Sequence, residues 1–137
     1  MIRRAEPGDI DDILPRIKPC EREAVVKLGL DPAELLRAAL PGYTYTGLVG
    51  SRVACMWGIV FGSLGQFPSM WVLTTELVDE HRVEFLRESR KFVRWATAEF
   101  GPLEGFCDCA NPSAARWLSW LGFRPVETFQ GYTRMRT

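Results

Sequence analysis

Four cysteines and one histidine are the first candidates for a nucleophile or a soft metal site: Cys20, Cys55, Cys107, Cys109 and His81. Cys107 and Cys109 are two residues apart on an expected strand, so both should point to one face of it. Two ligands do not make a zinc site, and His81, the only imidazole, lies on a different element. No cysteine therefore has an evident partner base. We expect core thiols rather than a metal centre or a nucleophile, kept reduced in a cytosolic protein.

Residues 111–123 read Asn-Pro-Ser-Ala-Ala-Arg-Trp-Leu-Ser-Trp-Leu-Gly-Phe, which predicts a short capped helix. Asn111 can cap the helix with its side-chain oxygen, and Pro112 suits the first turn, where its missing N–H needs no partner. Apolar residues then recur at helical spacing, and Gly122 stands where a left-handed cap is wanted. With strands expected over 103–110 and 124–128, the segment is a strand–helix–strand unit.

The remaining elements predict an α+β fold. Strands are expected over 2–5, 43–49, 52–61, 69–75 and 131–136, with a hairpin around Gly50-Ser51. A helix should begin at a cap on Asp9, and helical patterning continues, interrupted by prolines and a glycine, to residue 40. A long helix is expected from about 78 to 100. These elements predict one mixed, mostly antiparallel sheet flanked by helices, in a single domain that spans residues 1–137.

The long helix carries an apolar stripe on one side and charged residues on the other. Pairs such as Glu84 with Arg87 and Glu88 with Lys91 support an exposed helix by a few tenths of a kcal/mol each, on the order of 0.2–0.5. We interpret this side as a solvated face rather than a phosphate-binding patch.

Composition excludes several classes of function. At 137 residues the chain can bury one core but not two. Lys plus Arg and Asp plus Glu are 17 each, which argues against a nucleic-acid binder that relies on bulk charge. No run of apolar residues is long enough to span a membrane. The N-terminal residues Met-Ile-Arg-Arg-Ala-Glu lack the apolar core of a signal peptide, so we expect a cytoplasmic protein.

The order of residues in 111–123 resembles the last strand–helix–strand unit of the GCN5-related N-acetyltransferase (GNAT) superfamily. In that family an Asn opens a helix that ends in Leu-Gly-Phe, and Asn111, Ala114, Leu121, Gly122 and Phe123 fall in register with it. The N-terminal Arg-Arg-Ala-x-x-x-Asp-Ile followed by a helix is also how many members begin. The resemblance implies acetyl-CoA as cofactor, with its pantetheine arm beside this helix.

Two catalytic features of that family are missing from this chain. A tyrosine that protonates the departing thiolate often stands four positions before the glycine, where this chain has Leu118. Tyr132 on the last strand could in principle replace it as donor. The family also uses a glycine-rich turn into the long helix to cradle the cofactor's pyrophosphate. No glycine occurs here between Gly65 and Gly101, and the carboxylates Asp79 and Glu80 stand where the helix should begin, as caps that would compete with a phosphate.

One subgroup of the family fits both the motifs that the chain shares and the catalytic features that it lacks. The chain resembles, nearly from end to end, the small acetyltransferase-like proteins that short-tailed bacteriophages encode among their virion morphogenesis genes. The shared features are the Met-Ile-Arg start, a Trp-x-x-Thr strand end at Trp71–Thr74, a charged long helix without the glycine loop, and the Asn-to-Gly-Phe helix. This resemblance implies an internal virion or assembly role, a phage or host protein as partner, and a place in the host cytoplasm or in the virion.

Two functions from different classes follow. The first is a non-catalytic or weakly active relative that serves as a binding or assembly module. Most of its five tryptophans should lie in the core, and any exposed ones would suit a protein interface. The second is an active N-acetyltransferase that moves an acetyl group from acetyl-CoA to an amine. There Glu76, near a strand end, would deprotonate the amine through water, although a surface acid at a strand end explains Glu76 equally well.

The resemblance also predicts where the cofactor would bind. The strand near Trp71 and the strand near Phe106 should be adjacent and parallel, because a crossover helix joins them. Acetyl-CoA would then contact main-chain groups of Leu73 and Thr75, the helix start near Arg82 and Val83, and Asn111.

Overall fold

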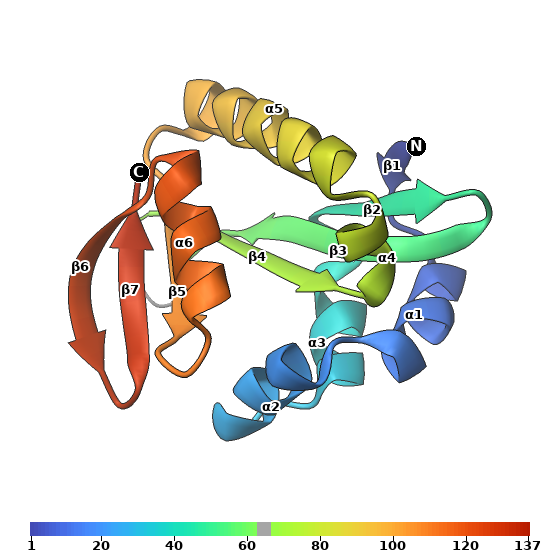
Figure 1. Cartoon of the computed structure of the whole chain (residues 1–137), viewed down its shortest axis with the longest axis horizontal. Coiled ribbons are helices and arrows are strands. Elements are labelled where there is room, and N and C mark those ends of the chain that lie inside the picture. The colour runs from blue at the N-terminus through green and yellow to red at the C-terminus, as the bar shows by residue number, and fades with distance from the viewer. Residues whose placement is uncertain (63–66) are drawn as a thin grey trace. The chain divides into compact units, whose positions relative to one another are not determined.

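The computed structural model describes residues 1–62 and 67–137, in two compact units (Figure 1). The first unit comprises residues 1–60 and 72–82, and the second comprises 61–71 and 83–137. Strand β4 (Ser69–Thr74) contributes residues to both units. The seven strands of the described residues form one sheet in the order β1-β2-β3-β4-β5-β7-β6. The predicted α+β class with a mixed, mostly antiparallel sheet is thus confirmed.

The first unit contains the N-terminal helices and a meander of strands. Its elements are β1 (Ile2–Arg4), α1 (Pro7–Ile13), the 3-10 turn η1 (Leu14–Arg16), α2 (Pro19–Lys27), α3 (Pro32–Ala39), β2 (Tyr43–Val49), β3 (Arg52–Val60), the end of β4, and α4 (Glu76–Glu80). Two of the prolines that interrupt the helical pattern, Pro19 and Pro32, are helix starts, and Pro7 likewise begins α1. A proline fits there because the first turn has no partner for its N–H. The core of this unit is aliphatic, with Ile13, Leu36 and Met56 fully buried.

A buried carboxylate joins β1, α1 and β2. Asp9 accepts two bonds from the Arg3 guanidinium at 2.7 and 2.8 Å, one from the Glu6 N–H, and one from the Thr46 hydroxyl. Burial alone would raise the pKa of Asp9, but these four donors outweigh it and hold that pKa below its ordinary value. The N-terminal Arg-x-x-x-x-x-Asp spacing therefore has a structural role. The N-cap of α1 is Glu6 rather than the predicted Asp9, whose side chain closes the capping box.

The second unit contains most of the long helix and the C-terminal strand–helix–strand unit. Its elements are the start of β4, α5 (Arg82–Phe100, of which Arg82 belongs to the first unit), β5 (Glu104–Asp108), α6 (Pro112–Leu121), β6 (Arg124–Phe129) and β7 (Tyr132–Arg136). Ser69 pairs with Glu104 and Met70 with Gly105, which confirms the predicted parallel pairing of the strands near Trp71 and Phe106. Helix α6 lies beside β5 (Figure 1).

The single helix predicted over 78–100 is two helices in the structure. Helix α4 ends at His81, whose φ of −123° and ψ of 42° are not helical, and α5 starts at the next residue. The cap at the start of α4 is Thr75 rather than Asp79 or Glu80. Charge patterning gave no sign of this break. In the described residues, no helix combines the length and hydrophobicity needed to cross a membrane.

A buried ion cluster holds β5 to β7 in the second unit. Glu104 has no exposed surface, and its carboxylate lies 3.4 Å from the nearest guanidinium nitrogens of both Arg134 and Arg136. On the outer side, Arg134 Nε is 3.1 Å from the carboxylate of Glu127 on β6, although the angle does not meet hydrogen-bond geometry. These charges link three antiparallel strands.

Candidate functional site

The end of β4 in the first unit is where the GNAT resemblance places the cofactor and the acceptor chemistry. Thr75 is 1% exposed, and its N–H donates to the Ala54 carbonyl of β3 at 3.0 Å. Its hydroxyl also donates to that carbonyl, and its own carbonyl accepts from the Val78 N–H of α4. Both main-chain groups of Thr75 are therefore already bonded within the protein.

Thr74 faces the opposite edge of the strand from Thr75. Successive residues of a strand direct their N–H and C=O groups to alternate edges, so the edge away from β3 belongs to Thr74. Residues at the start of α2 occupy that edge. The Glu21 carboxylate accepts the Thr74 N–H at 2.5 Å and the Thr74 hydroxyl, and the Lys18 N–H donates to the Thr74 carbonyl at 3.0 Å. Every polar group of Thr74 thus has a partner from the same unit.

Glu21 is the most chemically distinctive side chain of this unit, and the sequence analysis did not select it. Burial of its carboxylate raises the pKa of Glu21 above its ordinary value, even though both Thr74 donors and the charge of Lys18 act to lower it. Lys18 in turn pairs with Asp79 of α4 at 3.0 Å. A partly buried carboxylate with a raised pKa at a strand end is a candidate general base. A sequence signal was lacking, because Glu21 and Thr74 are 53 residues apart.

The segment that leads into α5 is itself helical. Thr75 caps α4 by accepting the Leu77 N–H, and the His81 N–H donates to the carbonyls of Leu77 and Val78. The N–H groups of Leu77, Val78 and His81 are therefore bonded within α4 and its cap, whereas a phosphate cradle presents free N–H groups. Glu76, the predicted base, is exposed at the first position of α4, and Arg82 and Val83 are exposed at the start of α5.

The remaining predicted contact, Asn111, lies in the second unit. As predicted, it caps α6, accepting the Ala114 N–H at 3.3 Å, and Gly122 ends the helix with a φ of 107°. Leu118 is 5% exposed and lies with Phe123 over Gly105 of β5. A side chain at that glycine would start 3.4 Å from the Phe123 ring. Position 118 thus serves the core of this unit.

The predicted cofactor contacts are divided between the units. Leu73, Thr75 and Arg82 belong to the first, and Val83 and Asn111 to the second. Leu73 is buried, at 4% exposed. Their binding of acetyl-CoA stays a prediction, as does the role of Glu76. Tyr132, the alternative proton donor, is 8% exposed and pairs in register with Asp108.

The thiols divide into two classes. Cys55 and Cys107 are buried, and burial raises the pKa of Cys55 to about 12 and raises that of Cys107. Cys20 and Cys109 are exposed, and Cys109 does not share a face with Cys107 because β5 ends at Asp108. Among residues 1–62 and 67–137, no three His, Cys, Asp or Glu side chains are grouped so that they could hold a metal ion.

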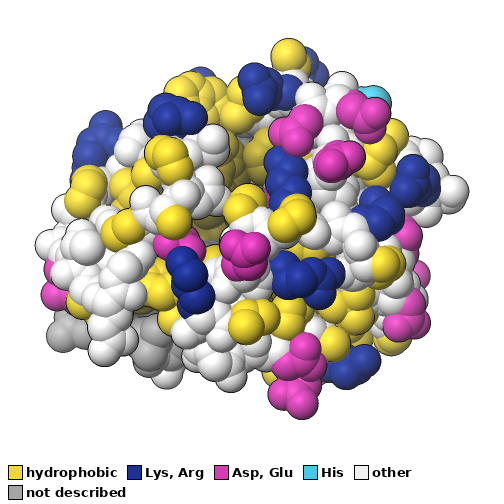
Figure 2. All heavy atoms as spheres, turned by 60° about the horizontal axis from the view of Figure 1, so that its bottom comes forward, with side chains coloured by type: hydrophobic (Ala, Val, Ile, Leu, Met, Phe, Trp, Pro, Cys, Tyr) yellow, Lys and Arg dark blue, Asp and Glu magenta, His cyan; other side chains and the backbone are white. Residues whose placement is uncertain are grey.

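Charges of both signs are distributed among hydrophobic side chains on the face shown in Figure 2. No large area of one sign is visible there, in agreement with the equal numbers of acidic and basic residues. Two of the tryptophans are exposed, Trp95 by 40% and Trp120 by 43%. The face shown offers no broad basic surface for a nucleic acid.

Comparison with solved structures identifies the fold. A GNAT-family acetyltransferase from Bacillus anthracis matches 99% of this chain and 92% of its own, with a TM-score of 0.73 and 10% identity. One from Streptococcus agalactiae matches 100% and 94%, with a TM-score of 0.67 and 13% identity. A putative acetyltransferase from Salmonella typhimurium, solved with its cofactor acetyl-CoA, matches 100% and 92%, with a TM-score of 0.61 and 15% identity.

These likenesses define the fold of the chain. The chain has the α+β fold of the GNAT acetyltransferases, and at such low identity the likeness concerns the fold alone. No model of a known protein family matches the sequence. The search of curated proteins also gave no match.

Proposed function

We propose that this protein is a GNAT-fold bacteriophage protein with a virion morphogenesis or internal virion role and with weak or no acetyl transfer. It acts in the host cytoplasm and is carried into the particle, and its partner is a phage or host protein. The end-to-end resemblance to the acetyltransferase-like proteins of short-tailed phages supports the role. The fold, shared with acetyltransferases, makes acetyl-CoA binding plausible without requiring turnover.

The observation that carries the proposal is that the main-chain groups at the end of β4 are already hydrogen-bonded within the protein. The edge of β4 away from β3 is bonded to Glu21 and Lys18 at Thr74. Both main-chain groups of Thr75 are bonded to Ala54 and Val78. The N–H groups of Leu77, Val78 and His81, in the segment that leads into the long helix, are bonded within α4 and its cap. Catalysis of acetyl transfer depends on positioning of the cofactor, which contributes orders of magnitude to the rate.

Calorimetry with millimolar acetyl-CoA tests the catalytic half of this proposal. We expect weak binding at most, with a dissociation constant of about 1 mM or weaker. Saturable binding, weakened by Asn111→Ala but retained by Asn111→Asp, which keeps the helix cap, would instead place the cofactor at the family site.

Mass spectrometry of purified phage particles tests the structural half. The protein should be present in particles of the phage that encodes it, at a reproducible copy number. Its absence from particles and from assembly intermediates would refute the virion role.

A second candidate, an active N-acetyltransferase, is favoured by one observation. Glu21 is a partly buried carboxylate with a pKa above its ordinary value, a property that favours a role as general base for an amine acceptor. In that case Glu21→Gln should lower the rate of acetyl transfer by about 10²–10⁴-fold, the usual contribution of general base catalysis. Loss of activity in Glu76→Gln but not in Glu21→Gln would assign the base to Glu76 as the sequence predicted.

A further inference from the structure

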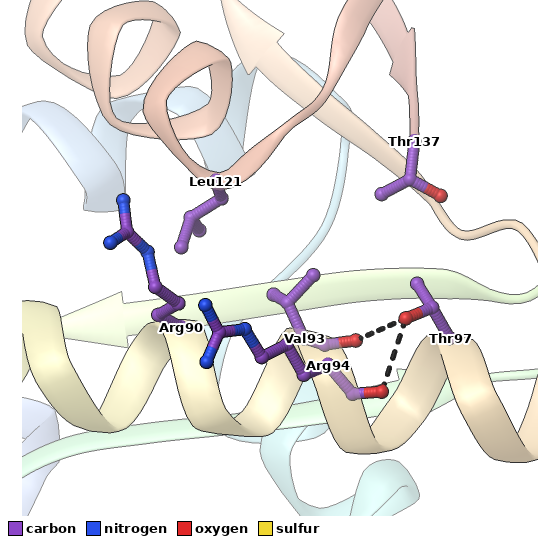
Figure 3. Close-up of a pocket in the computed structure, with 6 residues that line it drawn as sticks. All are labelled: Arg90, Val93, Arg94, Thr97, Leu121 and Thr137. Carbon is purple, nitrogen blue, oxygen red and sulfur yellow. Dashed lines mark hydrogen bonds between the residues drawn. The ribbon is translucent and has the colours of Figure 1, made fainter.

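A groove in the second unit is lined by residues that the proposed acyl-CoA site does not use. Its volume is about 300 Å³, and Figure 3 shows Arg90, Val93, Arg94 and Thr97 of α5 opposite Leu121, with Thr137 at one end. Arg90, the groove residue nearest the helix start, is seven residues beyond Val83, which is roughly 10 Å along the helix axis at 1.5 Å per residue. The groove is therefore distinct from the predicted cofactor contacts at the helix start.

The two arginines of the groove carry positive charges that no carboxylate neutralises among the described residues. The Arg90 guanidinium lies 3.9 Å from the centroid of the exposed Trp120 ring, which orients it. Nearby acids are paired elsewhere: Glu88 with Lys91, Glu127 with Arg134, and Glu104 with Arg134 and Arg136. Arg90 and Arg94 are four residues apart, so their side chains are neighbours on one helix face.

The groove combines this charge with apolar surface. Leu121, which is half-buried, supplies most of the apolar surface, because Val93 across from it is only 5% exposed (Figure 3). The Thr97 hydroxyl donates its proton to the helix carbonyls of Val93 and Arg94, so this proton is not available to bind a ligand in the groove. A bare inorganic anion would use the arginines but leave the apolar surface uncovered. Planar carboxylates match guanidinium groups well, and an adjacent apolar side chain would cover Val93 and Leu121.

We propose that this groove docks an acidic segment of a partner protein. Two carboxylates of the segment bind Arg90 and Arg94, and an apolar side chain beside them covers Val93 and Leu121. The choice of a protein ligand rests on the proposed function, which requires a protein partner. The charge complementarity and the apolar surface are properties of the groove itself.

The test uses the full chain labelled with ¹⁵N and two peptides, Ac-Ser-Glu-Ser-Glu-Ser-Leu-NH₂, in which both glutamates and the leucine share one face of an extended chain, and its matched form with Gln in place of Glu. In the first, the two carboxylates are roughly 7 Å apart in an extended chain. The indole N–H resonance of Trp120, assigned with Trp120→Phe, reports on binding. We expect saturable shifts with the Glu peptide, weakened by added salt, and binding at least about tenfold weaker for the Gln peptide.

Variants locate the site. Arg90→Gln and Arg94→Gln should each weaken binding of the Glu peptide by about tenfold. Arg116→Gln should leave it unchanged, because the Arg116 guanidinium contacts Ser113 on α6 and does not line the groove. Equal binding of both peptides, or no effect of Arg94→Gln in a variant that melts like the wild type, would overturn the proposal. Tighter binding of inorganic phosphate than of the Glu peptide, with the same shifts, would overturn it in favour of a phosphate ligand. The peptide test needs no acetyl-CoA, so its failure is separate from that of the acetyl-CoA experiments.

Discussion

At the scale of single residues, the most informative contact is the one between Glu21 and Thr74. A glutamate side chain near a helix start normally stays in water, where its charge is well solvated. Here it replaces a strand partner, accepting both the N–H and the hydroxyl of one threonine. If this contact persists, the Glu21 carboxylate is occupied, as the proposal of weak or no acetyl transfer requires. If the contact breaks, the released carboxylate is available as a general base.

The pKa of Glu21 predicts how stability depends on pH. Its pKa in the folded protein is above the ordinary 4.5, so the folded state holds this proton more tightly than the unfolded chain does. The resulting stabilisation is complete below about 4.5 and is lost as pH rises through the folded pKa. Glutamine cannot titrate, yet it can still accept the Thr74 N–H. The free energy of unfolding of Glu21→Gln should therefore rise relative to wild type over that range, as measured by urea titrations at a series of pH values.

Thr74→Val provides a matched control for this prediction. It keeps the main-chain donor but removes the hydroxyl that lowers the pKa of Glu21, so the pH-dependent loss should extend to higher pH. If the free energy of unfolding depended on pH in the same way in wild type and Glu21→Gln, the Glu21 carboxylate would have the same pKa in the folded and unfolded states, which would contradict the prediction.

At the scale of elements, strands β5, β6 and β7 depend on a buried charge. Glu104 is fully buried between Arg134 and Arg136, whose nearest nitrogens are 3.4 Å away, longer than usual for charged hydrogen bonds. Removing Glu104 would leave Arg136 partly buried without its counter-ion and Arg134 paired only with the exposed Glu127. We expect Glu104→Ala to lower the free energy of unfolding by about 3–5 kcal/mol, as measured by urea denaturation.

Glu127→Ala is the comparison for Glu104→Ala. Its carboxylate pairs with the same Arg134, but its side chain is 54% exposed. Exposed pairs contribute little, so the loss should be below about 1 kcal/mol. Similar losses for both variants would mean that burial does not determine the energetic role of Glu104.

At the scale of the whole molecule, charge balance is the dominant property. Lys plus Arg equals Asp plus Glu, and the isoelectric point is about 6.6. A protein with little net charge has little repulsion between copies, so solubility should be lowest near that pH. Polyethylene glycol precipitation across a pH series measures this. A solubility that changes steadily through pH 6.6 would indicate that exposed apolar side chains, rather than net charge, control association.

The elements themselves could largely be predicted from the sequence, because their signals are local. The Asn111 cap, the left-handed Gly122, the hairpin at Gly50 and the parallel strands around α5 follow from capping, turn chemistry and crossover rules. Prolines at helix starts set where α2 and α3 begin. Each of these features depends on a few consecutive residues or on chain connectivity.

Only the tertiary structure decided which groups meet at the end of β4. The alternation along a strand shows that Thr74 and Thr75 face opposite edges, but it does not show which edge faces β3. The answer came from Ala54, which bonds to Thr75, and from Glu21, which is 53 residues from Thr74. The Glu104 cluster likewise joins residues 30 and 32 positions apart. Such contacts leave no periodic signal in the sequence, because they depend on how distant elements pack rather than on the conformation of each one.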